Sequence, residues 1–160
     1  MFRRPYRALN AYLNLRRLSI TSSLRSEMPF TFASPGQVFY KDKNVKQIDV
    51  PSLSGSFGIL AEHVPTLACL TPGIVCVTEE DGSLKKYFVS SGTVTVNSDS
   101  SVQILAEEAI TLDMLDHTAV REGLSKAIQT LSSATTEEAK AEAQISLDCW
   151  EALNKAIEEK

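Results

Sequence analysis

The stretch Gly55-Ser56-Phe57-Gly58-Ile59-Leu60-Ala61-Glu62-His63-Val64-Pro65-Thr66-Leu67, followed by Leu70-Thr71-Pro72-Gly73, places backbone-breaking residues next to bulky apolar ones. Its glycines permit a positive φ or the close approach of another chain, and its prolines fix φ and push the preceding residue out of the helical region. The stretch therefore predicts a shaped loop between strands. Taken alone, it is equally compatible with a docking surface and with a surface Ω-loop that has no partner.

The sequence on both sides of this loop alternates between apolar and polar residues. From residue 30 to 110 the apolar positions recur every second residue, as at Val94 and Val96. Turn signals interrupt the pattern at short intervals, and Asp81-Gly82 is the strongest because both residues tolerate a positive φ. Many short strands at this spacing predict an antiparallel β-sandwich or barrel over residues 28–110.

One segment of this region, Gly73-Ile74-Val75-Cys76-Val77, is apolar at every position. A strand without alternation is either covered on both faces or contributes one face to a partner. The pattern leaves both possibilities open: helices of the same chain cover the strand, or residues such as Val75 and Val77 belong to an interface.

The apolar period changes to that of a helix after Thr111. Val120, Leu124 and Leu131 form one apolar stripe, and Asp116 precedes it as the expected N-cap. The sequence thus predicts a first amphipathic helix that ends near residue 132.

A second helix is predicted to follow at once. Thr135 and Glu138 form a capping box, and an apolar stripe continues to Ile157. Because the link between the helices is short, residues 111–160 are expected to form an antiparallel hairpin. Trp150 is its expected packing anchor, since many of the other apolar residues there are alanines, which bury little area each. The fold class is therefore α+β, mostly β at its N-terminal side.

Residues 1–27 have the composition of a mitochondrial transit peptide. The segment is rich in arginine and serine and contains no acidic residue before Glu27. Phe2, Tyr6, Leu9 and Leu13 share one face of a helical wheel, as in amphipathic import signals. A basic arm that stays attached and binds an acidic surface is the alternative.

The remainder of the chain is acidic, within a formal net charge of −4. Nucleic acids and anionic membranes require clustered Lys or Arg, so neither is an expected partner. The cysteines, Cys69, Cys76 and Cys149, are odd in number and lack the spacing of metal ligands. We expect reduced thiols, no metal and no cofactor, and no apolar run is long enough to predict a membrane span.

The usual signatures of catalysis are absent from the sequence. His63 and His117 lie in different predicted elements, and neither GxSxG nor a phosphate-binding loop occurs. The acidic run from Glu79 to Asp81 is expected to form a solvated turn, and Glu107-Glu108 to mark the point where the last strand leaves the sheet. The sequence therefore predicts a protein that is not an enzyme by itself.

The order G-x-F-G-I-L-x-x-H-x-P-T-L in the opening stretch resembles the small central-stalk subunit of F-type ATP synthases, called delta in mitochondria and epsilon in bacteria. The likeness continues through residues 105–113 and the helical hairpin, and Phe30-Thr31-Phe32-Ala33-Ser34-Pro35 with Tyr87-Phe88-Val89-Ser90-Ser91-Gly92 resembles the mitochondrial form. It covers nearly the whole chain after the transit peptide.

This resemblance implies a non-catalytic rotor subunit at the matrix side of the mitochondrial inner membrane. It would link the gamma subunit to the membrane ring of c subunits, with the small mitochondrial epsilon subunit as a further partner, and would touch the membrane only through that ring. The c-ring-facing residues would be Ser56, Phe57, Glu62 and His63. Candidate contacts with gamma or epsilon are Val75, Val77 and Trp150.

One departure from the family bears on an alternative function. Bacterial relatives that bind ATP have [IL]-D-x-x-R-[RA] at the first C-terminal helix, and here the segment is Leu115-Asp116-His117-Thr118-Ala119-Val120. An alanine replaces the required arginine, and Arg121 is rotated by about 200° from that position. The departure argues against nucleotide sensing and favours Asp116 as a helix cap. A nucleotide-sensing regulatory module is kept as the second hypothesis, and a small-ligand-binding or enzymatic sandwich is the third.

Overall fold

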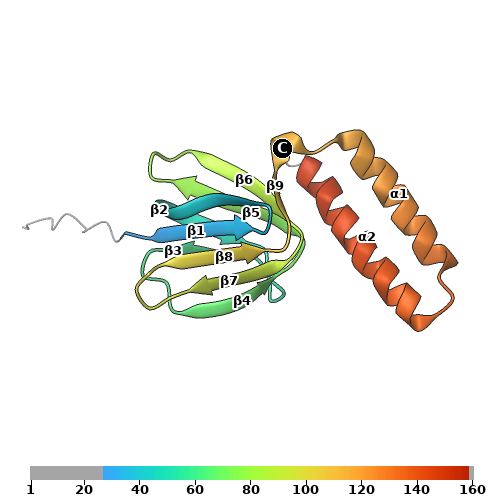
Figure 1. Ribbon diagram of the computed structural model, residues 1–160, viewed down its shortest axis with the longest axis horizontal. Helices are drawn as coiled ribbons and strands as arrows, with labels where there is room; N and C mark the ends of the chain where they lie inside the picture. The colour runs from blue at the N-terminus through green and yellow to red at the C-terminus, as the bar shows by residue number, and fades with distance from the viewer. Residues whose placement is uncertain (1–26, 159–160) are drawn as a thin grey trace, which may run out of the picture.

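The computed structural model describes residues 27–158, which form a β-sandwich followed by two helices (Figure 1). The predicted transit peptide lies outside the described residues, except for Glu27. The helices lie at one end of the sandwich, which we call the helix end. The opposite end, where the loops after β3, β5 and β7 lie, is called the loop end (Figure 1).

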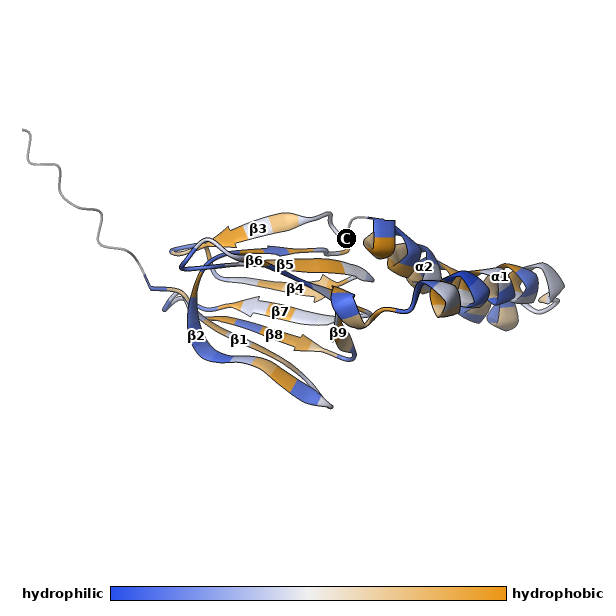
Figure 2. Ribbon diagram, turned by 90° about the horizontal axis from the view of Figure 1, so that it is seen from above, coloured by the Kyte–Doolittle hydropathy of each residue, from blue (hydrophilic) through white to orange (hydrophobic). Residues whose placement is uncertain are grey.

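Nine strands form a continuous, unclosed sheet in the order β4-β7-β8-β1-β2-β5-β6-β9, with β3 paired to β2. The strands are β1 Pro29–Ser34, β2 Gln37–Val50, β3 Phe57–Leu60, β4 Thr66–Leu70, β5 Gly73–Glu79, β6 Leu84–Val89, β7 Gly92–Val96, β8 Val102–Ala106 and β9 Ala109–Thr111. The 14-residue β2 bends from one layer into the other, so the sheet folds over on itself (Figure 2). The predicted sandwich is confirmed.

The pairing departs from the expected antiparallel pattern at one place. β1 pairs with β8 in parallel, in the register Phe30 to Val102 and Phe32 to Ile104. The two strands are far apart in sequence, and both run from the loop end to the helix end. Local turn signals carry no information about such a pairing.

The core lies between the two layers and consists of the inward-facing residues of alternate positions. Phe30, Phe32, Ile48 and Ile104 have no exposed surface. The rings of Phe30 and Tyr40 lie 5.1 Å apart, so aromatic packing joins β1 to β2.

The helical hairpin consists of α1, His117–Ser133, and α2, Glu137–Glu158, after a short 3-10 helix, Leu112–Met114. Asp116 caps α1 as predicted, because its carboxylate accepts hydrogen bonds from the backbone N–H groups of Thr118 and Ala119. The cap of α2 lies one residue later than predicted. Thr136, not Thr135, accepts a hydrogen bond from the N–H of Ala139 through its hydroxyl.

The hairpin is attached to the sandwich through a small apolar cluster. Its buried members are Phe88 of β6, Leu112 and Ala156 of α2, and Ile74 of β5 packs against them. The helix of the same chain thus covers part of the outer face of β5, which was one of the two possibilities for this all-apolar strand.

Candidate functional site

The predicted loop between residues 55 and 67 is a strand, a turn and a second strand. β3 pairs with β2 in one layer, and β4 pairs with β7 in the other. Gly55, which precedes β3, has a φ of 115°, and a residue with a side chain would be strained in this backbone conformation. The stretch thus connects the two layers, and it is not an Ω-loop.

The turn after β3 brings three of the four predicted ring-facing residues together. The N–H of His63 donates to the carbonyl of Leu60 at 3.1 Å, which closes the turn, and Glu62 sits in it with a φ of 63°. The His63 ring lies 6.1 Å from that of Phe57, and its Nδ1 donates to the carbonyl of Val64 at 2.8 Å. Ser56 precedes Phe57 at the opposite end of β3 and is exposed, and unlike Phe57 it has no ring that reaches the turn.

Large apolar side chains are exposed around this turn. Leu60, Val64 and Leu67 are 55%, 69% and 75% exposed. Isolated exposed apolar residues are ordinary, but several beside one turn indicate a contact surface.

On the outer face of the layer that contains β4, two neighbouring rows carry no charged side chain, and Asp42 of β2 borders the first of them beside Thr31. Register places Leu67 beside Thr95, and Thr95 beside Gln103 and then Thr31; the adjacent row is Cys69, Thr93, Leu105, Ala33 and Val38. Leu105 and Val38 are 58% and 59% exposed. We call these two rows the uncharged face. Charged residues are depleted at the centres of protein interfaces, so this face has the composition of one.

Two of the predicted interface residues are not available for contacts. Val75 and Val77 have no exposed surface, because both point into the sandwich core. Their assignment to a gamma or epsilon interface is wrong. The strand is apolar throughout because one face lies in this core and Ile74, on the other, packs against the helix cluster.

Trp150 is half-buried and packs closely against α1. A Cβ built on Gly123 would lie 2.5 Å from the indole ring, so the two helices approach closely at this level. Trp150 thus joins the two helices, as expected of an anchor, and its remaining exposed surface leaves it as a predicted partner contact.

A cluster at the loop end was missed from the sequence. Glu79 is only 8% exposed, and its carboxylate contacts the ammonium groups of Lys43 at 2.7 Å and Lys85 at 2.6 Å. The hydroxyl of Tyr40 donates to it at 3.0 Å and receives a hydrogen bond from Tyr87. Hydrogen bonds from Lys43 and Lys85 lower the pKa of Glu79 to about 2, and burial raises that of Tyr40.

The expectation that Glu79 belongs to a solvated turn is therefore wrong. It is the last residue of β5, and it continues the inward positions of Val75 and Val77. This alternation is the feature of the sequence that could have indicated that Glu79 points inward. No feature of the sequence indicates its partners, of which Lys43 lies 36 residues away.

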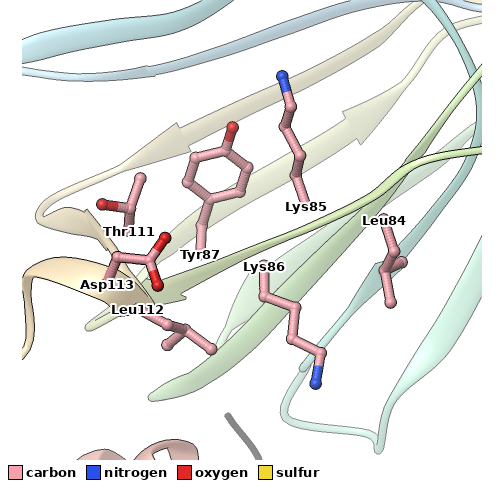
Figure 3. A pocket seen from close by; sticks show the side chains of 7 residues that line it. All are labelled: Leu84, Lys85, Lys86, Tyr87, Thr111, Leu112 and Asp113. Atoms are coloured by element: carbon pink, nitrogen blue, oxygen red, sulfur yellow. The ribbon is translucent and has the colours of Figure 1, made fainter.

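A hollow of about 420 Å³ lies at the edge of β6, beyond the point where β9 stops pairing with it. Lys85 and Tyr87 point to one side of the strand, and Leu84 and Lys86 to the other (Figure 3). Its polar groups therefore do not converge on one point, and those of Lys85 and Tyr87 are already bonded within the Glu79 cluster. This geometry does not support the small-ligand hypothesis.

A second hollow, about 540 Å³, lies between the turn after β1 and helix α2, where Cys149 and Glu108 line it. Burial, and secondarily the nearby Glu108, raise the pKa of the Cys149 thiol. A raised pKa keeps the thiol protonated and unreactive, so the hollow has no activated nucleophile there. None of the three cysteines, which all lie within residues 27–158, forms a disulfide bond.

Neither a metal site nor a membrane-spanning helix occurs within residues 27–158. No group of His, Cys, Asp or Glu in this part is arranged to hold a metal ion. None of its helices is long and apolar enough to cross a bilayer.

Asp116, which would belong to a nucleotide site, instead caps helix α1. The carboxylate of Asp116 lies 2.8 Å from the N–H of Thr118 and serves as the helix cap. Arg121 is exposed on α1. The nucleotide-sensing hypothesis therefore gains no support from this segment.

Family models match both parts of the chain. Residues 27–112 match the ATP synthase delta/epsilon chain β-sandwich domain, and residues 115–156 match the C-terminal domain of the metazoan delta subunit of F1F0-ATP synthase. Subunit delta of the mitochondrial ATP synthase of Caenorhabditis elegans is 48% identical over 130 residues, which cover 81% of this chain and 79% of the relative. That of Kluyveromyces lactis is 44% identical over 126 residues, 79% of this chain and 78% of the relative.

Solved structures give the same result. A chain in the Euglena gracilis mitochondrial ATP synthase structure of OSCP, F1 and c-ring matches with a TM-score of 0.76 and 29% identity, over 82% of each chain. A chain of the Tetrahymena thermophila central stalk and c-ring structure has a TM-score of 0.65 at 17% identity, over 81% of this chain and 96% of that one, and shows the shared fold alone. The sandwich, the hairpin and these matches together establish that the chain belongs to the ATP synthase delta/epsilon family.

Proposed function

We propose that this chain is the delta-type rotor subunit of a mitochondrial F-type ATP synthase. It joins the gamma subunit to the ring of c subunits in the central stalk, on the matrix side of the inner membrane, so that proton-driven rotation is coupled to ATP synthesis. Its relatives are named as mitochondrial delta subunits, and its matched structures are of ATP synthase stalk and ring assemblies.

We infer that the subunit performs no chemistry of its own. His63 lies in a turn and His117 in α1, the strongly perturbed carboxylate of residues 27–158, Glu79, is held by two lysines, and the half-buried Cys149 has a raised pKa. These are features of a structural protein, in which charged groups are paired and thiols are protonated.

The observation that carries the proposal is the uncharged face. An obligate interface of a rotor commonly buries more than about 2,000 Å² and is more apolar than an ordinary surface. The uncharged face spans β4, β7, β8, β1 and the start of β2, and it is continuous through Leu67 with the exposed apolar residues of the β3–β4 turn. We assign this face to gamma, and the turn with Phe57, Glu62 and His63 to the ring.

The hairpin and the hollow beside Cys149 provide the surface for the small epsilon subunit in this proposal. Trp150 lies on the hairpin with part of its ring exposed. Ser56 is a further predicted contact with the ring, although it lies a strand length of about 13 Å from the turn.

The test is assembly of the full complex from a chain with one charge placed on the uncharged face. Leu105→Asp alters a side chain that is 58% exposed, so the fold should survive. Leu84→Asp, at a position that is 55% exposed on the other layer, is the matched control. Both variants are checked by circular dichroism, and the amount of gamma that copurifies with each is measured.

We expect Leu105→Asp to reduce copurified gamma by about tenfold or more, because a desolvated carboxylate without a partner costs several kcal/mol. The Leu84→Asp control should assemble normally. Equal recovery of gamma with both variants, each being folded, would show that the uncharged face is not the gamma interface.

A further inference from the structure

A hydrogen bond joins two loops at the loop end. The N–H of Glu62, in the turn after β3, donates to the hydroxyl of Ser100 at 3.3 Å. Ser100 lies between β7 and β8, 38 residues further along the chain. Figure 1 shows both loops at the end of the sandwich opposite the helices.

Both residues of this bond have an unusual backbone conformation. Glu62 has a φ of 63° and Ser100 a φ of 67°, and Asp42 is the remaining non-glycine residue with a positive φ among residues 27–158. Such conformations cost free energy and persist only where the surroundings hold them. That two of the three are bonded to each other indicates that each helps to hold the other.

The turn that contains Ser100 is held by its own hydrogen bonds. The N–H of Asn97 donates to the carbonyl of Ser101 at 2.9 Å, and that of Ser100 donates to the carbonyl of Asn97 at 3.2 Å. The carboxylate of Asp99 accepts from the hydroxyl and the N–H of Ser101, and these bonds lower its pKa. The Ser100 hydroxyl is thus presented from a braced turn.

The Glu62 turn also has hydrogen bonds of its own. Its closing bond runs from the N–H of His63 to Leu60, and the carbonyl of Val64 accepts from the His63 ring and from the Thr66 hydroxyl. The bond to Ser100 links this turn to the neighbouring loop. The φ of Glu62 helps to set the direction of its Cα–Cβ bond, so this tie also influences the side of the turn from which the side chain leaves the backbone.

We propose that Ser100 is a positioning residue for the ring-binding turn: its hydroxyl holds Glu62 in the left-handed conformation that presents Glu62 and His63 to the ring of c subunits. This inference rests on the proposed function of that turn. Ser100 itself need not touch the ring.

Substitutions at Ser100 separate its two contributions, the φ that it adopts and the hydroxyl that it offers. Ser100→Gly keeps a backbone that tolerates a positive φ but has no acceptor for the Glu62 N–H. Ser100→Asn tolerates a positive φ and offers a side-chain carbonyl in place of the hydroxyl. Ser98→Ala, at an exposed position of the same turn, is the matched control.

The measurement is the affinity of the purified c-ring, in mild detergent, for a complex of the full mature chain with gamma and epsilon. We expect Ser100→Gly to weaken binding by about three- to tenfold, the range of one ordinary hydrogen bond. Ser100→Asn should bind within about twofold of the wild type, and Ser98→Ala should not differ from it. The melting temperature is followed for each variant, since a general loss of stability would not be restored by asparagine.

Glu62→Gln, alone and combined with Ser100→Gly, completes a double-mutant cycle. Both single changes should weaken binding, and their effects should not add, because they act on one contact. If Glu62→Gln weakens binding and Ser100→Gly does not, the positioning role is refuted while the ring-binding turn stands. If neither change affects the ring, both the assignment of the turn and the role of Ser100 are refuted.

Discussion

Replacing Glu79 by glutamine is expected to destabilise the sandwich by about 2 kcal/mol. The Glu79 side chain is 11% exposed, and the two lysines that it contacts are 50% and 48% exposed. A fully buried ion pair would cost about 3–5 kcal/mol to break, and an exposed one contributes about 0.2–1 kcal/mol. Because the lysines are half in solvent, each contact falls near the upper end of the exposed range, at about 1 kcal/mol.

Glutamine keeps an acceptor for the Tyr40 hydroxyl, which lies 3.0 Å from the carboxylate. Alanine provides no such acceptor and leaves the buried Tyr40 hydroxyl without one. Glu79→Ala should therefore destabilise the fold by about 1–3 kcal/mol more than Glu79→Gln does. The ratio of the two losses thus separates the charge of Glu79 from its hydrogen bond to the tyrosine.

The effect of Glu79→Gln depends on pH in a direction that the structure fixes. The pKa of Glu79 falls from 4.5 to about 2 on folding, so its charged form is favoured in the folded state. Its contribution is complete above pH 4.5 and disappears as the pH falls towards 2. The difference between wild type and variant should therefore be constant near neutrality and shrink in acid.

The assay is urea unfolding followed by circular dichroism at several pH values. In a thermal scan at neutral pH the variant should also melt about 6 °C below the wild type, given about 3 °C per kcal/mol for a chain of this size. Glu80→Gln, the exposed neighbour, is the control and should change nothing. Equal unfolding midpoints for Glu79→Gln and the wild type, or a gap that persists undiminished in acid, would refute the reasoning.

Three further changes test other contacts. Asp116→Ala removes the cap of α1 and should destabilise the hairpin by about 1 kcal/mol, measured as an earlier loss of helical circular dichroism; no change would deny the cap its role. Gly123→Ala drives a methyl into Trp150, the only tryptophan, so its fluorescence should shift to the red; an unchanged spectrum would mean that the helices absorb the methyl without moving the ring. Val75→Asp buries a charge in the core and should prevent folding, by more than about 4 kcal/mol, whereas a soluble, folded variant would contradict its burial.

The elements that the sequence predicts correctly are those set by neighbours in the chain. Asp81-Gly82 forms the turn between β5 and β6, and Gly82 has a φ of 87°. Asp116 caps α1 through residues two and three positions away. In each case the signal and the structure that it specifies lie within one turn of chain.

The elements that the sequence does not predict depend on distant pairings. The parallel pairing of β1 with β8 and the passage of β2 between layers follow from packing of the complete sheet. The Glu79 cluster draws on three strands, and the bond from Glu62 to Ser100 joins two loops. A polar residue at an inward position, as at Glu79, signals that a partner exists, but the partner's identity depends on how strands far apart in sequence align.

The Glu79 cluster has a mechanical consequence for a subunit that transmits torque. Hydrophobic packing between two layers is non-directional, so it resists separation more than it resists sliding. Charge-assisted hydrogen bonds depend on direction, and Glu79 of β5 is bonded to Lys43 in the bend of β2 and, through Tyr40, to the aromatic residues of the core. The unclosed sheet is thus locked at its loop end, the end that carries the turn assigned to the ring. At the other end, the cluster of Phe88, Leu112 and Ala156 attaches α2 to the layer that contains β5 and β6. The tie between the layers at the loop end and the attachment of the hairpin at the helix end let a rotor subunit pass rotation from one partner to the other as one body.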